Sequence, residues 1–215
     1  MLHKAPSTIL PETLTILETL QRDPFLDDFF LVGGTALALQ IGHRQSIDLD
    51  FFTLKPFENQ ELGDYLIQAY DFNIDYISKN TIKGFIQNVK VDFLTHGYIL
   101  LKPFVIEDGL KLASIEDIGA MKLNAISHSG TRQKDFYDLY FILEYLSLDD
   151  LVHAYKRKYP NSNAVIPLKA INWFNDIDFE IERPLLAQKI SFKQVEKRLK
   201  SAVNQPRKVF RSGKI

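Results

Sequence analysis

The chain has 215 residues, of which 46% are hydrophobic and 25% charged, and this composition excludes a disordered or collagen-like protein. It has no cysteine, so disulfides, zinc knuckles and thiol catalysis are excluded. No apolar run approaches the roughly 20 residues of a membrane-spanning helix, and the first residues lack the apolar stretch of a signal peptide. We therefore expect a cytoplasmic protein with no membrane partner.

The balance of 26 Lys and Arg against 27 Asp and Glu conceals an asymmetry along the chain. Residues 189–215 hold nine basic residues and one acidic residue, a net charge of +8, so the residues before them carry −9. An acidic body with a basic tail bears on partners rather than on fold. Within the tail, the helix-like stretch 192–203 is either a solvated face or a surface that follows a nucleic-acid backbone.

Hydrophobic periodicity predicts a mixed arrangement of helices and strands up to about residue 113. In chain order the expected elements are a helix from Pro11 that ends at Asp23-Pro24, a buried strand at 29–32, a glycine turn and helix at 33–40, a strand at 47–52, a helix at 58–70, strands at 73–77, 81–87 and 89–95, and an edge strand at 105–112. The close spacing of the three strands between 73 and 95 is typical of an antiparallel meander.

From residue 114 onward the pattern becomes helical. The expected helices are 115–127, 134–146, 148–159, 167–175 and 192–203, with breaks at Pro160, Pro167 and Pro184. We therefore predict an α+β protein: a small mixed or antiparallel sheet with flanking helices in residues 1–113, then a helical region in residues 114–215 that ends in the basic tail.

The sharpest local feature is Asp48-Leu49-Asp50. Side chains two residues apart in a strand project from the same face. Two carboxylates at such a short distance repel each other unless a cation lies between them or one of them is protonated. Oxygen ligands on a strand suit Mg²⁺, which leaves its other positions to phosphates and water. The alternative is that the two aspartates only solvate the exposed face of an edge strand.

Two neighbouring features favour phosphate chemistry. Gly33-Gly34 follows an apolar run and opens a helix, an arrangement in which backbone N–H groups cradle phosphate, and Thr35 adds a hydroxyl there. Strand alternation in 89–94 places a third carboxylate, Asp92, on the face opposite the valines. A phosphate turn with three strand-borne carboxylates outlines a two-metal site for phosphoryl transfer.

These residues resemble a known family. FLVGGTALAL at 30–39 and RQSIDLDFF at 44–52 are similar to the first motifs of the nucleotidyltransferase AbiEii/AbiGii toxin family, which belongs to the DNA polymerase β-like nucleotidyltransferase superfamily. MKLNA at 121–125 and RQKDFYDL at 132–139 are similar to its third and fourth motifs. The resemblance covers about half to two-thirds of the chain.

The resemblance implies a nucleotidyltransferase fold and a role for each matching residue. The residues that it assigns to catalysis are Asp48, Asp50, Asp92, Lys122 and Asp135, with Asp48, Asp50 and Asp92 as ligands of Mg²⁺, or of Mn²⁺ in its place. The expected nucleotide-binding residues are Gly33, Gly34, Thr35, Arg44, Ser46, Arg132, Lys134 and Asp138. Asp92, the third carboxylate and expected general base, matches a position that this family does not use uniformly.

Simpler interpretations of several of these residues stay open. Lys122 has the pattern of a solvated helix lysine as well as that of a triphosphate clamp. Asp135 can stabilise the N-terminal dipole of its helix, and Ser46 can support Asp48 instead of contacting a nucleotide. Arg44 lies between the first two motifs, where it can contact a phosphate.

The function that we expect is Mg²⁺-dependent transfer of NMP from an NTP to a hydroxyl acceptor, with release of pyrophosphate. The resemblance implies a toxin of a toxin–antitoxin or phage-defence system, with RNA, such as tRNA, as the acceptor and an antitoxin as a partner. The basic tail would bind that RNA. Two alternatives stay open: a non-catalytic nucleotide- or RNA-binding module on the same fold, and a metal-dependent glycosyltransferase.

Overall fold

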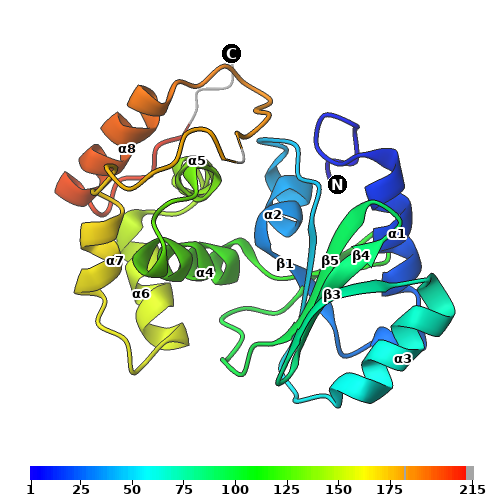
Figure 1. The fold of residues 1–215 in the computed structure, drawn as a ribbon. Helices are drawn as coiled ribbons and strands as arrows, with labels where there is room; N and C mark the ends of the chain where they lie inside the picture. The colour runs from blue at the N-terminus through cyan, green and yellow to red at the C-terminus, as the bar shows by residue number, and fades with distance from the viewer. Residues whose placement is uncertain (182, 212–215) are drawn as a thin grey trace. The chain divides into compact units, whose positions relative to one another are not determined.

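A mixed seven-stranded sheet occupies the first half of the protein in the computed structural model, which describes residues 1–181 and 183–211 (Figure 1). Its strands are β1 Phe30–Val32, β2 Leu49–Thr53, β3 Asn73–Ser78, β4 Thr81–Ile86, β5 Val89–Thr95, β6 Val105–Glu107 and β7 Leu110–Leu112. The strand order is β3-β4-β5-β2-β1-β7-β6, with antiparallel pairing through β3, β4 and β5 and parallel pairing of β2 with β5 and of β1 with β7. The predicted α+β class and meander are confirmed.

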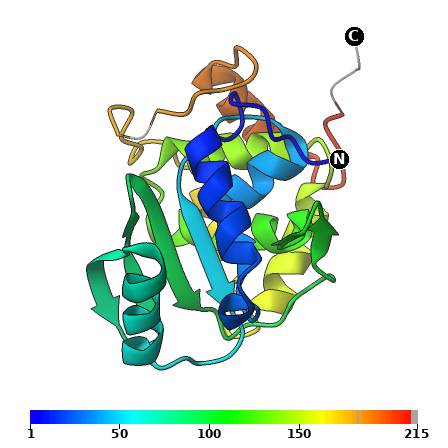
Figure 2. The same ribbon diagram turned by 90° about the vertical axis from the view of Figure 1, so that its right-hand side faces the viewer.

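Four short helical segments accompany this sheet: α1 Pro11–Gln21, the 3₁₀ turn η1 Pro24–Leu26, α2 Gly33–Ile41 and α3 Asn59–Tyr70. Helix α2 contacts β1 and β2, α3 lies along β3 and β4, and α1 contacts β7 (Figures 1 and 2). The core between them is aromatic, because Phe51 of β2 and Phe93 of β5 are register partners whose rings stack with centroids 5.3 Å apart. Buried rings of this size supply much of the apolar area that stabilises a small sheet.

The prediction of a single edge strand at 105–112 is wrong, because this segment forms two strands. Asp108 and Gly109 both have positive φ, 55° and 77°, and this turn folds the segment into the hairpin β6–β7. Strand β7 then pairs with β1 inside the sheet, and β6 becomes the edge. An Asp-Gly pair is a recognised signal for a two-residue hairpin, but the flanking strands are too short to show alternation.

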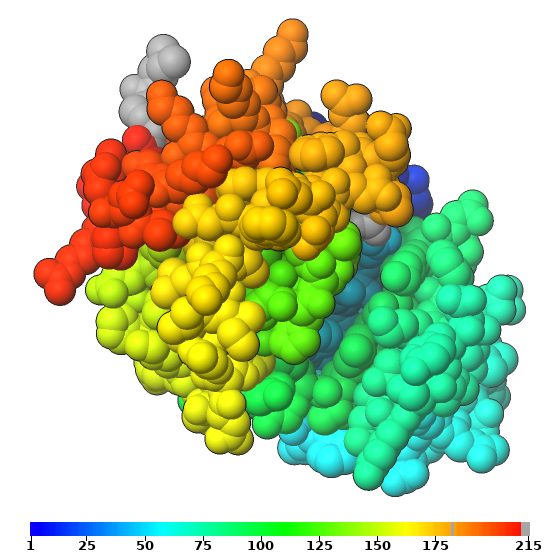
Figure 3. Space-filling model, turned by 60° about the vertical axis from the view of Figure 1, so that its left-hand side comes forward, coloured from blue at the N-terminus to red at the C-terminus, as the bar shows by residue number. Residues whose placement is uncertain are grey.

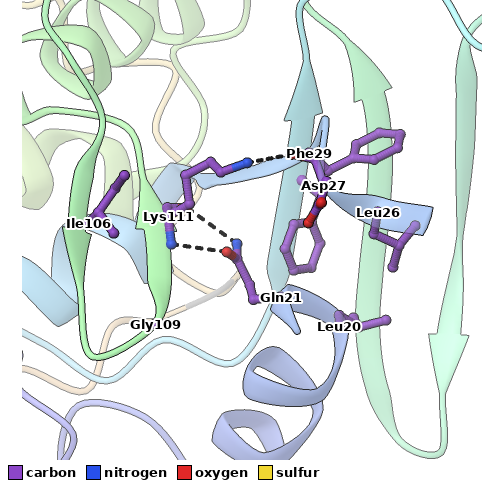
Figure 4. Close-up of a pocket in the computed structure, with 9 residues that line it drawn as sticks. Leu20, Gln21, Leu26, Asp27, Phe29, Ile106, Gly109 and Lys111 are labelled. Carbon is purple, nitrogen blue, oxygen red and sulfur yellow. Dashed lines mark hydrogen bonds between the residues drawn. The ribbon is translucent and has the colours of Figure 1, made fainter. Parts of the chain in front are cut away.

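The side chain of Gln21, at the end of α1, completes the hydrogen bonding of β7. Its amide donates to the carbonyl of Lys111 (3.2 Å) and accepts from the N–H of Lys111 (2.9 Å). Figure 4 shows this pair at the edge of a small pocket whose wall includes Leu20, Leu26 and Phe29. One glutamine therefore replaces the backbone of a neighbouring strand where β1 does not extend far enough.

The chain forms two compact units. The first is Met1–Ile99 with Pro103–Ala113, and the second is Leu100–Lys102 with the chain from Ser114 onward. The helices of the second unit are α4 Ile115–His128, α5 Gln133–Ile142, α6 Leu148–Lys158, α7 Val165–Ala170 and α8 Phe192–Asn204, in agreement with the expected helical half. Helix α4 contacts α5, α6 and α7, and α8 contacts α5.

Two of these helices differ from their expected bounds. Helix α5 ends at Ile142 instead of 146, since the chain turns immediately afterwards to the Ser147 cap of α6. Helix α7 begins at Val165, where the Asn163 side chain accepts from the first N–H, so Pro167 lies within its first turn, a position that proline tolerates.

The described part of the basic C-terminal segment, residues 189–211, contains a packed helix and stays against the second unit. Helix α8 buries Val195, Leu199 and Ala202. After it, the N–H of Phe210 donates to the carbonyl of Leu143 (2.8 Å), so the chain stays against the same unit. Figure 3 shows α8 in orange and red at the surface. No helix within residues 1–181 and 183–211 is long and apolar enough to cross a membrane.

Candidate active site

The glycine turn between β1 and α2 brings main chain against charged side chains. Gly33 has φ +70°, and a Cβ atom added there would lie 2.3 Å from Oδ2 of Asp50. A Cβ atom at Gly34 would lie 2.2 Å from a guanidinium nitrogen of Arg44. Only glycine allows this approach, which sets the N-terminus of α2 beside a carboxylate and a guanidinium. The N-cap residue is Val32, whose side chain cannot accept from the first N–H groups of the helix.

Thr35 and Ser46 hold the loop that carries Asp48. The Thr35 side chain is 1% exposed, and its hydroxyl donates to the main-chain carbonyl of Asp48. The same hydroxyl lies 2.9 Å from Oγ of Ser46. Ser46 in turn donates its N–H to the carbonyl of Thr8 (2.9 Å). Both hydroxyls were expected at a bound nucleotide, and in this structure they support the Asp48 loop.

The paired carboxylates do not arise entirely from strand alternation. Strand β2 begins at Leu49 and not at 47, because the carbonyl of Asp48 is taken by Thr35. Asp50 lies within the strand, and its register partner in the parallel pair is Asp92 of β5. Register partners project from the same face of a sheet, so these two aspartates are neighbours on that face. Asp48 and Asp50 are half-buried.

Asp92 is buried and faces two lysines. Nζ of Lys83, on β4, lies 3.3 Å from Oδ2 of Asp92, and Nζ of Lys90 lies 3.8 Å from the same oxygen. The other oxygen, Oδ1, is buried without a hydrogen-bond partner among the described residues. The sequence analysis did not identify Lys83, although the sequence contains a signal for it. The two-residue turn between β4 and β5 pairs Ile86 with Val89, and that register places Lys83 opposite Asp92.

The fit of these residues to Mg²⁺ follows from their oxygen donors. No group of three or more His, Asp or Glu side chains is placed to hold a metal ion in the part of the chain that the structure describes. The expected three carboxylates therefore do not form one ready cluster. Asp48 and Asp50 fit an ion that takes two protein carboxylates and completes its shell with phosphates and water.

The remaining predicted residues lie in the second unit, where three of them form a buried ion cluster. Lys122 of α4 is 8% exposed, and its Nζ lies 2.5 Å from Oδ1 of Asp135 and 2.6 Å from Oδ2 of Asp138. Both aspartates are on α5 and also buried. Arg132 is the N-cap of α5, and Lys134 is in its first turn. The alternative of a solvated Lys122 is wrong.

A glycine turn that opens a helix beside strand carboxylates, on a mixed sheet, defines the nucleotidyltransferase class. The structure is similar to two crystal structures. JHP933 from Helicobacter pylori is 17% identical with a TM-score of 0.54, covering 93% of this chain and 94% of that chain. An antigenic nucleotidyltransferase-like protein from Paracoccidioides brasiliensis is 18% identical with a TM-score of 0.50, covering 93% and 97%. At these identities the likeness shows the fold.

The chain belongs to the family described as "Nucleotidyl transferase AbiEii toxin, Type IV TA system", whose model matches residues 15–208. It is also 36% identical over 161 residues to the uncharacterized protein aq_aa25 of Aquifex aeolicus (strain VF5), covering 72% of this chain and 78% of that protein. The protein is therefore a nucleotidyltransferase of the EC 2.7.7 type and a toxin of a type IV toxin–antitoxin system. The expected family and enzyme class are confirmed, and the glycosyltransferase alternative is wrong.

Proposed function

We propose that this protein transfers the NMP group of an NTP to a hydroxyl group of RNA, with Mg²⁺ held by Asp48 and Asp50. The observation that carries this proposal is the close approach of Gly33 to Oδ2 of Asp50, which a Cβ atom at Gly33 would prevent by lying 2.3 Å from that oxygen. A phosphate bound by the first N–H groups of α2 would lie next to that carboxylate. A divalent ion there would neutralise the charge of both the carboxylate and the phosphate.

The chain's own residues account for the rest of the reaction. The N-terminus of α2 and the Arg44 guanidinium beside Gly34 bind and orient the triphosphate. The acceptor oxygen attacks the α-phosphorus, and the bond to the bridging oxygen breaks so that pyrophosphate leaves with the electron pair. Asp92, the register partner of Asp50 on the neighbouring strand, takes the proton of the acceptor hydroxyl.

The exposed face of α8 supports RNA as the acceptor. Lys193 and Lys197 lie one turn apart on this face, and both side chains are exposed. Regularly spaced ammonium groups can contact successive phosphates without reading sequence. The acidic remainder of the chain repels polyanions, so an RNA acceptor needs such a surface.

The test is incorporation of label from α-labelled NTPs into total RNA in the presence of Mg²⁺. We expect Asp48→Asn and Asp50→Asn to lower incorporation by about 10²-fold or more, because phosphoryl transfer depends strongly on neutralising the charge that develops on the phosphate oxygens. Asp75→Asn is the matched control, since Asp75 is an exposed acid on β3 of the same sheet.

Three results would contradict the proposal. If Asp50→Asn incorporated as much label as the wild type, the reaction would not depend on this site. Label that resists ribonuclease would exclude RNA as the acceptor. Mg²⁺-dependent NTP binding without transfer to RNA would exclude RNA as the acceptor.

A further inference from the structure

We propose that Lys83 is the resident cation at Asp92, a positioning residue whose ammonium group keeps this carboxylate out of metal coordination. The divalent ion of the site then depends on Asp48 and Asp50. This inference rests on the metal site in the proposed function, and it replaces the two-ion arrangement that three carboxylates suggested.

The register of the meander fixes Lys83 where it is. Strands β4 and β5 are joined by a two-residue turn that pairs Ile86 with Val89, so Lys83 is directly opposite Asp92. The next residue, Gly84, holds β4 tightly against β3, because a Cβ atom there would lie 2.1 Å from the carbonyl oxygen of Asn73. A slip of this strand by one residue would turn Lys83 to the other face of the sheet.

The charge of Asp92 needs a partner because the carboxylate is buried. Its side chain is 6% exposed, and a buried carboxylate without a counter-charge is strongly unfavourable. Lys83 supplies that charge at 3.3 Å from Oδ2, with a side chain 35% exposed. Lys90 is more distant, at 3.8 Å, and more exposed, at 45%, so solvent screens it more. The resident ion pair is therefore formed chiefly by Lys83.

This pairing decides what each oxygen of Asp92 can do. Strand β5 lies between β4 and β2, so Lys83 approaches Oδ2 from the strand opposite to the one that carries Asp50. A divalent ion on Oδ2 would meet an ammonium group of the same sign at close range. An ion on Oδ1, which has no hydrogen-bond partner in the described part of the chain, would meet a carboxylate whose negative charge Lys83 already neutralises, so both oxygens bind it less well.

The experiment is a titration of the full-length protein with Mn²⁺, followed by calorimetry and by the electron paramagnetic resonance signal of free Mn²⁺, without NTP or RNA. We expect Lys83→Met to bind Mn²⁺ about tenfold more tightly than the wild type, or to bind one further ion, because the buried carboxylate loses its counter-charge. Lys83→Gln should behave in the same way, whereas Lys83→Arg should bind Mn²⁺ as the wild type does.

Two controls connect the gain to Asp92. Lys90→Met removes the same charge from the neighbouring strand β5, on the same face of the sheet, and should change Mn²⁺ affinity by no more than about twofold. The double variant Lys83→Met/Asp92→Asn should lose the gain. Thermal unfolding monitored by circular dichroism identifies any variant that fails to fold, and Lys83→Gln then provides the comparison.

Unchanged Mn²⁺ binding in folded Lys83→Met and Lys83→Gln would overturn the inference, as would a gain that survives Asp92→Asn. Because neither NTP nor RNA is present, failure of NMP transfer to RNA leaves this result unaffected. Conversely, a gain in Mn²⁺ affinity does not establish transfer.

Discussion

The hydroxyl of Thr35 donates a hydrogen bond to the main-chain carbonyl of Asp48. This bond joins the first turn of α2, which begins at the glycine turn, to the loop that leads into β2. The two halves of the candidate site are therefore held together by a buried side chain that need not touch substrate. Ser46, 2.9 Å from the same hydroxyl, extends the connection.

Replacing Thr35 by valine should lower both stability and transfer. The substitution keeps the shape of the side chain but leaves the carbonyl of Asp48 and the hydroxyl of Ser46 without their partner, at a cost of about 1–3 kcal/mol. Urea unfolding measures the loss, and incorporation of NMP measures its effect on the Asp48 loop. Thr35→Ser retains the hydroxyl and is the control. Equal activity in Thr35→Val would mean that the loop does not depend on this bond.

Gly33→Ala should be more damaging than Gly109→Ala, although both glycines have positive φ, 70° and 77°. The left-handed backbone alone costs about 1 kcal/mol for alanine at either position. A Cβ atom at Gly33 also meets Oδ2 of Asp50, whereas nothing lies within 4 Å of one at Gly109. We expect Gly33→Ala to lose at least about 1 kcal/mol more and to abolish transfer. Similar unfolding midpoints for the two variants would argue against the close approach.

The larger elements of this fold could be predicted because their sequence patterns are local. The observed bounds of β5, Val89–Thr95, agree with its alternation, and α4 and α6 begin at residues that directly follow a serine cap. The hairpin β6–β7 could not be found in the same way, since three-residue strands show no periodicity. The position of β7 beside β1 depends on packing across the sheet, which no local pattern encodes.

The candidate site was predictable in its residue types and not in its ion pairs. The motif around Asp48 and Asp50 is visible in the sequence, whereas the burial of Lys122 depends on how α4 packs on α5. A lysine among apolar neighbours on an isolated helix has the same pattern whether it is solvated or buried. Lys83 was predictable in principle, because the hairpin register follows from the length of its turn.

Removing the charge of Lys122 should destabilise the second unit strongly. Lys122→Met would leave Asp135 and Asp138 facing each other in the interior, and breaking a buried ion pair on one side costs about 3–5 kcal/mol. The triple variant Lys122→Met/Asp135→Asn/Asp138→Asn should recover much of that loss. Lys102→Met is the control, since Lys102 is 55% exposed and lies 4.0 Å from Glu116. Chemical denaturation distinguishes these cases, and a loss below about 1 kcal/mol in Lys122→Met would contradict the buried cluster.

Asp23 should make stability depend on acid pH. Burial raises the pKa of its carboxyl group, but hydrogen bonds from the Tyr65 and Tyr70 hydroxyls and from the Phe25 N–H outweigh burial, so the net pKa lies below its ordinary value. The unfolded chain then binds a proton at higher pH than the folded one. The stabilisation is therefore present above the ordinary aspartate pKa of about 3.9 and is lost as pH falls through the folded value.

The variant Asp23→Asn tests this dependence. At pH 7 its free energy of unfolding should be lower than that of the wild type by about 1 kcal/mol. The expected difference is small because Asp23 is partly exposed to solvent, which screens its interactions. The difference should shrink as pH falls from about 4 through the lowered pKa of the folded protein, because the unfolded chain takes up its proton first. Urea unfolding between pH 2.5 and 7 provides both curves, and parallel curves would contradict the role of the tyrosine hydroxyls.

The contribution of α8 to RNA binding has to be tested by substituting its charged residues and not by truncating the chain. Removal of residues 189–215 would delete Val195 and Leu199 from the interior of the second unit, so a loss of RNA affinity would not identify charge as the cause. Lys193→Ala/Lys197→Ala keeps the buried face of the helix. If both ammonium groups contact phosphates, the slope of log Kobs against log salt for single-stranded RNA should decrease in magnitude by about 1.4.

The matched control for that double variant is Lys156→Ala/Arg157→Ala, which removes two exposed charges from α6 of the same unit. Non-specific attraction by net charge would weaken RNA binding equally in both variants, whereas a surface centred on α8 would be affected only by the first. Fluorescence anisotropy at several salt concentrations separates the two cases. Mn²⁺ binding should be the same in both variants, because the proposed ion ligands Asp48 and Asp50 are in the first unit.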